Sequence, residues 1–371
     1  MNKRPGTFIL AWLAAMLALL SMAGGVFAAP SASPYTDSAS MALKWIGTQQ
    51  SPDGSFAGFG AGSTVDAVLS IVAAGGHADS FAHGYNAVAF LQNNAGAIAK
   101  TAGGAGKLLV AVSALGQNGK SFGGVDLVGA INSTYGISAT GRYGPDALGH
   151  AFAILGLHAA GEPVPADAVT QLESLQASDG GWAFTGDTSP GAADTNTTAV
   201  AVQALLAAGA TGSTLDKAAA YLAGQQNADG GWPYQKGGQF GSESDVNSTA
   251  YVVQAMLALK NAALAEAGQS YIVSLQNPSG AFPYQKSQPD DNPGATYQAI
   301  TALLGATMTT PKPAAGVSPA TAVSNPAAPT PVTPGMPTTG VGADWLFIAA
   351  LVLAAFALSA AGLAIRRSAT K

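Results

Sequence analysis

The side chains best suited to chemistry lie in two phrases of nearly the same composition. The first runs from Asp194 to Ala199 (DTNTTA) and the second from Asp245 to Ala250 (DVNSTA), and an apolar segment follows each. A carboxyl group at the start of a helix can act as a general acid, contact a ligand, or accept hydrogen bonds from the free N–H groups of its own helix. Asp194 and Asp245 are therefore candidate catalytic or binding residues, although capping is the more ordinary role.

Three more polar residues near the starts of expected helices extend this set of candidates. Asp146 opens another apolar segment, and Asn196 and Asn247 occupy the third place of the two phrases. An amide forms hydrogen bonds but has no proton acidic enough to start a reaction. Asp146 is thus a third candidate acid, whereas Asn196 and Asn247 are candidate ligand contacts.

A second repeated phrase brings rings and cations into two long loops. Residues 232–236 read WPYQK and residues 282–286 read FPYQK. A ring with a polar edge beside a flexible cation suits stacking on a sugar, a peptide or another ring-bearing ligand. Tyr234, Lys236, Tyr284 and Lys286 are therefore candidate ligand contacts, while the first ring of each phrase is expected to pack between structural units.

Several chemistries lack the residues they need. The chain has no Cys, which excludes disulfides and a zinc site with thiolate ligands. Of its four His, only His150 and His158 share an expected helix, so we predict no metal site and no cofactor. A glycosidase needs two facing carboxylates, and with four Glu in the chain such a pair would have to draw on Asp. The net charge of −5 argues against a nucleic-acid partner.

The elements that position these residues follow from an internal repeat. Gln is followed four residues later by Gly and six residues later by an aromatic ring. The four copies are Gln50, Gly54 and Phe56; Gln176, Gly180 and Trp182; Gln226, Gly230 and Trp232; and Gln276, Gly280 and Phe282. Each copy lies between two apolar segments with helical spacing, so each unit is predicted to be a helix, a turn and a helix.

The spacing predicts an all-α domain of six helix pairs over residues 29–308. The expected pairs are 37–50 with 62–76, 82–93 with 102–116, 123–134 with 145–160, 164–177 with 193–209, 213–226 with 244–259, and 265–276 with 292–307. Six pairs can close into a ring, or they can stack as an open solenoid, because periods of 40 to 50 residues also occur in armadillo-like arrays.

The turn motif and the two Asp phrases resemble those of squalene-hopene cyclases and protein prenyltransferase β-subunits. That resemblance implies an α6/α6 toroid, with a ligand cavity at the end where the inner helices begin. The cyclase phrase is Asp-x-Asp-Asp-Thr-Ala, and its middle Asp supplies the acid; here that place is Asn196 or Asn247. Prenyl transfer requires zinc held by Asp, Cys and His, which this chain cannot provide. The resemblance therefore implies the fold without the family's catalytic groups.

Both ends of the chain indicate export and attachment to the cell surface. Residues 1–28 have a basic start, an apolar stretch and small residues, as in a secretory signal peptide. Residues 345–365 carry no charge over a length that spans a bilayer, and the basic tail 366–371 follows. We therefore expect a transmembrane helix with the bulk of the chain outside the cell.

A stalk and a short motif lie between the predicted all-α domain and the predicted transmembrane helix. Residues 309–335 are rich in Pro, Ala and Thr, a composition typical of an extended linker. The motif that follows, residues 336–340, consists of Met336, Pro337, Thr338, Thr339 and Gly340. Together with the span and the basic tail it resembles a sortase sorting signal, which implies cleavage after Thr339 and attachment to cell-wall peptide. Because Met336 stands where the sorting signal has Leu, the alternative that the span stays in the membrane as a permanent anchor remains open.

Three functions are compatible with these observations. The first is a non-catalytic surface module that binds a small molecule, glycan or peptide at the toroid mouth, as the missing acid and missing zinc ligands favour. The second is a terpenoid-cyclase-like enzyme, or another lyase or hydrolase, that uses Asp146, Asp194 or Asp245. The third is a structural surface protein. An Asp side chain left unpaired inside the ring would favour the enzyme, whereas an Asp that only caps its helix would favour the binding module.

Overall fold

A computed structural model describes residues 35–58 and 60–311 of the chain. The predicted signal peptide, the stalk beyond residue 311, the sorting motif, the membrane span and the basic tail lie outside the described residues. Within the described ranges, no helix combines the length and the apolar character that crossing a membrane requires.

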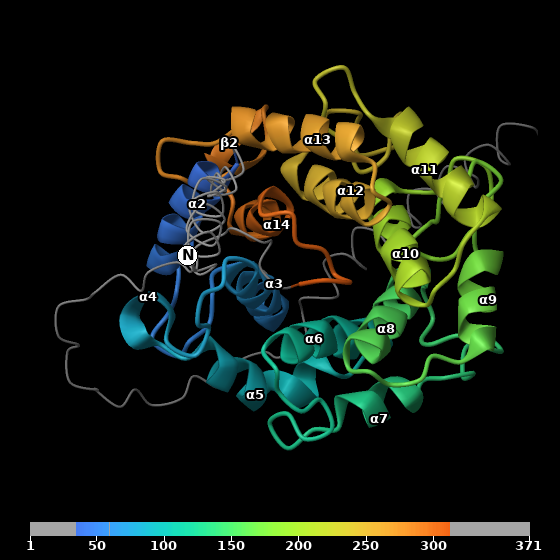
Figure 1. Cartoon of the computed structure of the whole chain (residues 1–371), viewed down its shortest axis with the longest axis horizontal. Coiled ribbons are helices and arrows are strands. Elements are labelled where there is room, and N and C mark those ends of the chain that lie inside the picture. The colour runs from blue at the N-terminus through green and yellow to red at the C-terminus, as the bar shows by residue number, and fades with distance from the viewer. Residues whose placement is uncertain (1–34, 59, 312–371) are drawn as a thin grey trace, which may run out of the picture.

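The described chain forms two concentric layers of helices (Figure 1). The outer helices are α2 (Thr36–Thr48), α5 (Ala87–Ile98), α7 (Leu127–Asn132), α9 (Ala166–Ser174), α11 (Ser213–Gln225) and α13 (Ala262–Ser274). The inner helices are α3 (Gly60–Ala73), α6 (Ala102–Ala114), α8 (Ala147–Ala159), α10 (Thr195–Ala207), α12 (Val246–Ala258) and α14 (Pro293–Leu303). The short helix α4 (Phe81–Gly84) precedes α5, and an antiparallel hairpin of β1 (Pro283–Gln285) and β2 (Gln288–Asp291) precedes α14.

The inner helices close into a ring. Each packs against the next along the chain, and α14 packs against α3 to complete the circle. Inner helices are buried on nearly all sides, as α8 is, whereas outer helices such as α9 bury one narrow stripe. The predicted all-α toroid is confirmed, and the open solenoid is excluded.

The recurring spacing of the turn has a steric cause that reaches beyond the turn itself. Gly180 adopts φ of 94° and Gly280 adopts φ of 95°, a left-handed conformation that L-residues rarely take. A Cβ on Gly180 would lie 2.4 Å from the backbone oxygen of Lys217 in α11, and one on Gly280 would lie 2.6 Å from that of Met41 in α2. Glycine therefore allows each turn to lie directly against the next outer helix.

The turn Gln fastens each unit to its neighbour. The Gln176 amide donates to the oxygen of Gly180 at 2.9 Å and to that of Thr214 at 2.8 Å. Gln276 repeats this geometry, donating to Gly280 at 2.8 Å and to Ser38 in α2 at 2.8 Å. The last unit thus contacts the first through the same hydrogen bond that joins neighbours within the ring.

The aromatic residue of the turn belongs to the core. The Trp182 and Trp232 rings are fully buried, and their indole N–H groups donate to the oxygens of Leu172 at 2.7 Å and Leu222 at 2.6 Å. Each ring therefore packs beneath the outer helix that precedes it, with its polar edge satisfied.

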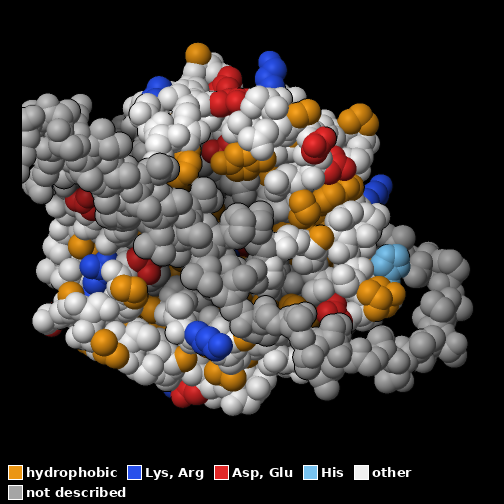
Figure 2. Space-filling model, turned by 180° about the vertical axis from the view of Figure 1, so that it is seen from behind, with side chains coloured by type: hydrophobic (Ala, Val, Ile, Leu, Met, Phe, Trp, Pro, Cys, Tyr) orange, Lys and Arg blue, Asp and Glu red, His pale blue; other side chains and the backbone are white. Residues whose placement is uncertain are grey.

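The segment after α14 closes one end of the ring. Leu304, Ala306 and Met308 are buried, and the Met308 N–H donates to the Gln203 side-chain oxygen of α10 at 2.9 Å. This segment crosses the ring centre where the inner helices end (Figure 1). On the reverse face of the molecule, charged side chains of the described residues are scattered rather than gathered (Figure 2).

Candidate functional site

The inner helices begin at the end opposite to the closing segment, and side chains cap them there. Five of these caps accept a hydrogen bond from the N–H three residues on, with distances of 2.6 to 3.0 Å. They are Thr101, Asp146, Asp194, Asp245 and Asn292. The three candidate acids thus lie at equivalent positions, each at the start of its own helix.

Asp194 has its hydrogen-bonding capacity taken up by the protein. Its carboxylate accepts from the N–H groups of Thr197 at 2.7 Å and Phe184 at 3.1 Å, and from the Tyr234 hydroxyl. Burial raises the pKa of Asp194 to about 6, because desolvation outweighs these hydrogen bonds. The side chain is 1% exposed, so this carboxyl is a buried cap.

Asp245 repeats the arrangement one unit later. It accepts from the Ser248 N–H at 2.7 Å and from the backbone of Tyr234, and burial raises its pKa to about 7. Asp146 caps Gly149 at 2.6 Å, and burial also raises the pKa of its carboxyl, with Arg142 opposing the shift. Each of the three acids therefore meets the criterion for helix capping, and none is an unpaired acid.

The predicted loop contacts join neighbouring units. The Tyr234 hydroxyl reaches Asp194 of the preceding unit, and its ring meets Phe240 edge-on at 5.6 Å. The Lys236 ammonium donates to the backbone oxygen of Gln226 at 3.0 Å, near the end of α11. Tyr284 lies near Asp245, and Lys286 is exposed on the hairpin. A ligand role for these four residues stays a prediction.

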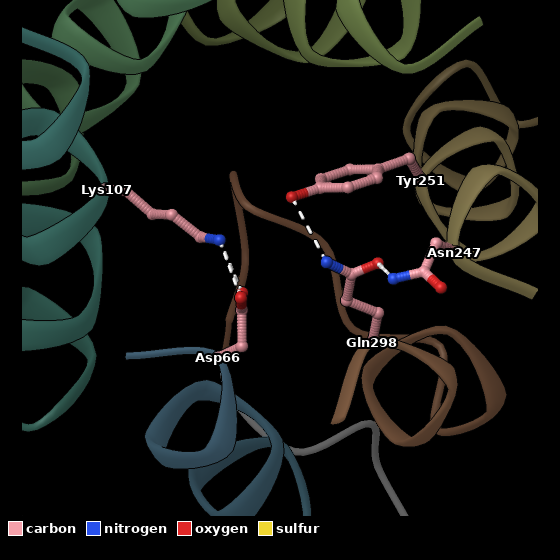
Figure 3. A network of polar contacts seen from close by, with 5 residues as sticks. All are labelled: Asp66, Lys107, Asn247, Tyr251 and Gln298. Carbon is pink, nitrogen blue, oxygen red and sulfur yellow. Dashed lines mark hydrogen bonds and ion pairs between the residues drawn. The ribbon is translucent and has the colours of Figure 1, made fainter. Parts of the chain in front are cut away.

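Four side chains that the sequence had not singled out meet Asn247 at the ring centre (Figure 3). The Lys107 ammonium of α6 lies 2.6 Å from the Asp66 carboxylate of α3. The Gln298 amide of α14 donates to the Tyr251 hydroxyl at 3.5 Å and accepts from the Asn247 amide at 2.9 Å. We call these five residues the central network. Asn247 is its only member among the predicted ligand contacts, and Asn196 lies outside it.

The central network holds a compensated ion pair. Burial alone would lower the pKa of Lys107, but Asp66 and then Tyr251 reverse this and raise the pKa above its ordinary value. Burial raises the pKa of Tyr251, against the influence of Lys107. Lys107 also lies 5.7 Å from the centre of the Phe152 ring on α8. The network therefore contains one ion pair beside a phenol whose raised pKa keeps it neutral.

A sequence signal for this network exists, although it is indirect. Lys107 interrupts the apolar run of α6, and Asp66 interrupts that of α3, where a charge needs a partner. Asn247, Tyr251 and Gln254 recur at the spacing of one helical face. That the two charged residues pair with each other requires the contact between α3 and α6.

Within the described residues, no cluster of metal ligands adds to the site, and His150 has a structural role. The described part of the chain holds no group of three or more His, Cys, Asp or Glu that could bind a metal. His150 is fully buried; its Nδ1 accepts from the Tyr143 N–H at 3.1 Å, and its Nε2 bonds the Ala168 oxygen at 2.9 Å. Burial lowers the pKa of His150 to about 4, so it is a neutral structural residue.

Comparison with known proteins identifies the fold. Residues 148–316, less than half of the chain, match the model of the Prenyltransferase alpha-alpha toroid domain. A protein from Actinoplanes is 16% identical with a TM-score of 0.53, covering 72% of this chain and 98% of its own. No curated protein matches the chain in sequence.

Two solved structures with ligands share the architecture. A variant of the type II terpene cyclase MstE from Scytonema, in complex with merosterolic acid A, is 15% identical with a TM-score of 0.51 over 73% of this chain and 96% of its own. A glycosidase variant in complex with glucose is 14% identical with a TM-score of 0.52 over 73% and 97%. The chain thus has an α/α toroid fold like that of type II terpene cyclases, and its residues 148–316 are similar to the Prenyltransferase alpha-alpha toroid domain. At these identities the likeness concerns the fold alone.

Proposed function

We propose that this protein is a non-catalytic binding module whose ligand enters the toroid where the inner helices begin. One observation carries the proposal: the carboxyl groups at the inner-helix starts cap their own helices. Asp194, the most buried of them, accepts from two backbone N–H groups and one hydroxyl. A general acid must reach the atom that it protonates, and these carboxylates face their own backbone.

The residue types at the start of the helices support the same proposal. The place of the cyclase acid is held by Asn196 and Asn247, whose amides bind but do not protonate. Asn247 turns toward the ring centre, where it contacts Gln298 (Figure 3). The ligands of the two related structures, a terpenoid and a sugar, belong to proteins too distant to choose the ligand class for this chain.

We further propose that the module is displayed outside the cell. This rests on the order of signal peptide, stalk, motif 336–340, span and basic tail, which resembles a sortase substrate. Sortase and cell-wall peptide would then be its partners. Mass analysis of wall digests for a peptide ending at Thr339 tests the idea, and a chain recovered intact from membranes would make the span the anchor instead.

An enzyme is the second candidate, and one observation favours it. Burial raises the pKa of Asp194 to about 6 and that of Asp245 to about 7, into the range where a carboxyl can donate a proton near neutral pH. A cyclase-like lyase or a hydrolase would use one of these groups after its cap loosened.

Native mass spectrometry of the full chain in detergent, incubated with cell-wall fragments and surface extract, separates the two candidates. Asp194→Asn and Asp245→Asn keep an acceptor for the cap but remove the acid. The control is Asp126→Asn, because Asp126 caps the outer helix α7 through Gly129 at 2.8 Å. A bound ligand of unchanged mass in every variant supports a binding module. Conversion of the ligand that stops in either inner-helix variant, but not in the control, would establish an enzyme.

A further inference from the structure

We propose that the ring centre binds a neutral, hydroxyl-rich ligand, a single sugar unit or a cyclic polyol, through the central network of Asp66, Lys107, Asn247, Tyr251 and Gln298 (Figure 3). This inference rests on the proposed binding function and names the ligand class and the place. It is carried by the convergence of polar side chains from four inner helices at the ring centre.

The central network is partly open to solvent. The side chains of Lys107 and Asp66 are 17% and 14% exposed, and Asn247, Tyr251 and Gln298 are likewise neither fully buried nor exposed. Toward the other end of the ring, Gln203 is buried beneath Met308 of the closing segment. A ligand can therefore approach from the end where the inner helices begin, and a small ligand suits a ring closed at its far end.

The charges at the centre favour a neutral ligand. Lys107 and Asp66 compensate each other at 2.6 Å, so neither an anion nor a cation would meet a free counter-charge. A buried charge without a partner is strongly unfavourable. Polar groups that carry no net charge could replace solvent at this pair without disturbing the balance.

Two buried acceptors indicate that the ligand must donate hydrogen bonds. No described group donates to Asn247 Oδ1 or to Gln254 Oε1, although both atoms are buried. With Tyr251 between them, they follow one face of α12 at positions i, i+4 and i+7. Gln203 differs from Gln254, because the side-chain oxygen of Gln203 accepts a hydrogen bond from the Met308 N–H. Hydroxyl groups of a ligand would satisfy the two unpaired acceptors.

The same acceptors disfavour a pure hydrocarbon. An isoprenoid chain at the ring centre would bury the amide oxygens of Asn247 and Gln254 against groups that cannot donate, which is unfavourable for each of them. Tyr251 meanwhile offers a partly exposed aromatic ring that suits the C–H groups of a pyranose ring. Acceptors, donors and an aromatic ring in one place are the combination that recognises a sugar.

The test is isothermal titration and ligand-observed NMR on the full chain in detergent. The neutral probes are glucose, galactose, N-acetylglucosamine and myo-inositol; glucuronate and glucosamine are their charged counterparts, and farnesol is the hydrocarbon. We expect at least one neutral probe to bind with a millimolar or lower Kd, at least tenfold more tightly than its charged counterpart and than farnesol. Binding of none of the neutral probes, or equal binding of the charged ones, would overturn the inference.

A matched pair of variants places the ligand. Gln254→Leu removes an unpaired buried oxygen, so we expect a higher Tm together with affinity for the sugar at least tenfold weaker. Gln203→Leu leaves the Met308 N–H without its acceptor, so we expect a lower Tm and unchanged affinity. Tyr251→Phe, which removes one hydroxyl, provides a second loss of affinity. Unchanged affinity in both Gln254→Leu and Tyr251→Phe refutes this site, while continued capture of a surface ligand by those variants would leave the proposed binding function intact.

Discussion

Replacing Gly280 with alanine measures how strongly the last unit is attached to the first. The new Cβ would lie 2.6 Å from the Met41 backbone oxygen of α2, and φ at this residue is 95°. The left-handed conformation costs alanine about 1 to 2 kcal/mol. Forcing a methyl group into packed backbone adds about 1 to 3 kcal/mol. We therefore expect Gly280→Ala to lower the free energy of unfolding by about 3 kcal/mol.

The assay is urea unfolding followed by circular dichroism, with two reference variants. Gly209 has φ of 81° and nothing within 4 Å of a built Cβ, so Gly209→Ala should cost only the conformational part, about 1 to 2 kcal/mol. Gly180→Ala meets the Lys217 oxygen at 2.4 Å inside the ring and should cost as much as Gly280→Ala. For a domain of this size, about 3 kcal/mol corresponds to a fall in Tm of roughly 6 to 12 °C.

The comparison can refute ring closure directly. In a closed toroid the Gly280 and Gly180 variants lose similar stability, because both turns press on an outer helix. In an open solenoid the last turn would face solvent, and Gly280→Ala would cost no more than Gly209→Ala. Equal effects of the Gly280 and Gly209 variants would therefore contradict the contact between the last unit and α2.

Three further predictions concern the buried ionisable groups. His150 has a folded pKa of about 4, below its unfolded value of about 6.5, so the free energy of unfolding decreases as pH falls through this window. His150→Gln keeps a donor and an acceptor but does not titrate. Between pH 7 and pH 5 its free energy of unfolding, measured with urea, should therefore fall by about 2 kcal/mol less than that of the wild type. Asp194 has a raised pKa of about 6, so its contribution is present at pH 4 and lost as pH rises through 6; Asp194→Asn should flatten that part of the stability profile, and an unchanged profile would show that the carboxyl titrates normally. Asp66→Asn leaves the Lys107 charge without its partner and should lower the free energy of unfolding by about 3 kcal/mol. Adding Lys107→Met should recover part of this loss. A double variant whose loss equals the sum of the two single losses would contradict the pairing.

Much of the fold could be predicted because its signals are local. The Gln, Gly and aromatic spacing marks each turn, and apolar periodicity marks the helices on either side. The pair expected at 213–226 with 244–259 corresponds to α11 and α12, Ser213–Gln225 and Val246–Ala258. The capping role of Asp194 and Asp245 could be predicted in the same way, since each cap bonds an N–H three residues on.

The candidate site was less predictable because its contacts join distant parts of the chain. Tyr234 could be found as a repeated ring, but its bond to Asp194 of the preceding unit could not. Lys107 stood out only as a charge in an apolar helix, and its partner Asp66 lies 41 residues away. Pairing at that distance depends on how two helices pack, which no local pattern specifies.

The sequence by itself determined the repeat, the helix pairs, the caps and the absence of thiolate chemistry, because each of these depends on residue types and on neighbours within a few positions. The tertiary structure decided ring closure, in which Gln276 bonds Ser38 across 238 residues. It also decided the central network, which four helices build together (Figure 3). The physical reason is that a ring brings the two ends of a domain into contact and creates a centre, and the groups that meet there share no proximity along the chain.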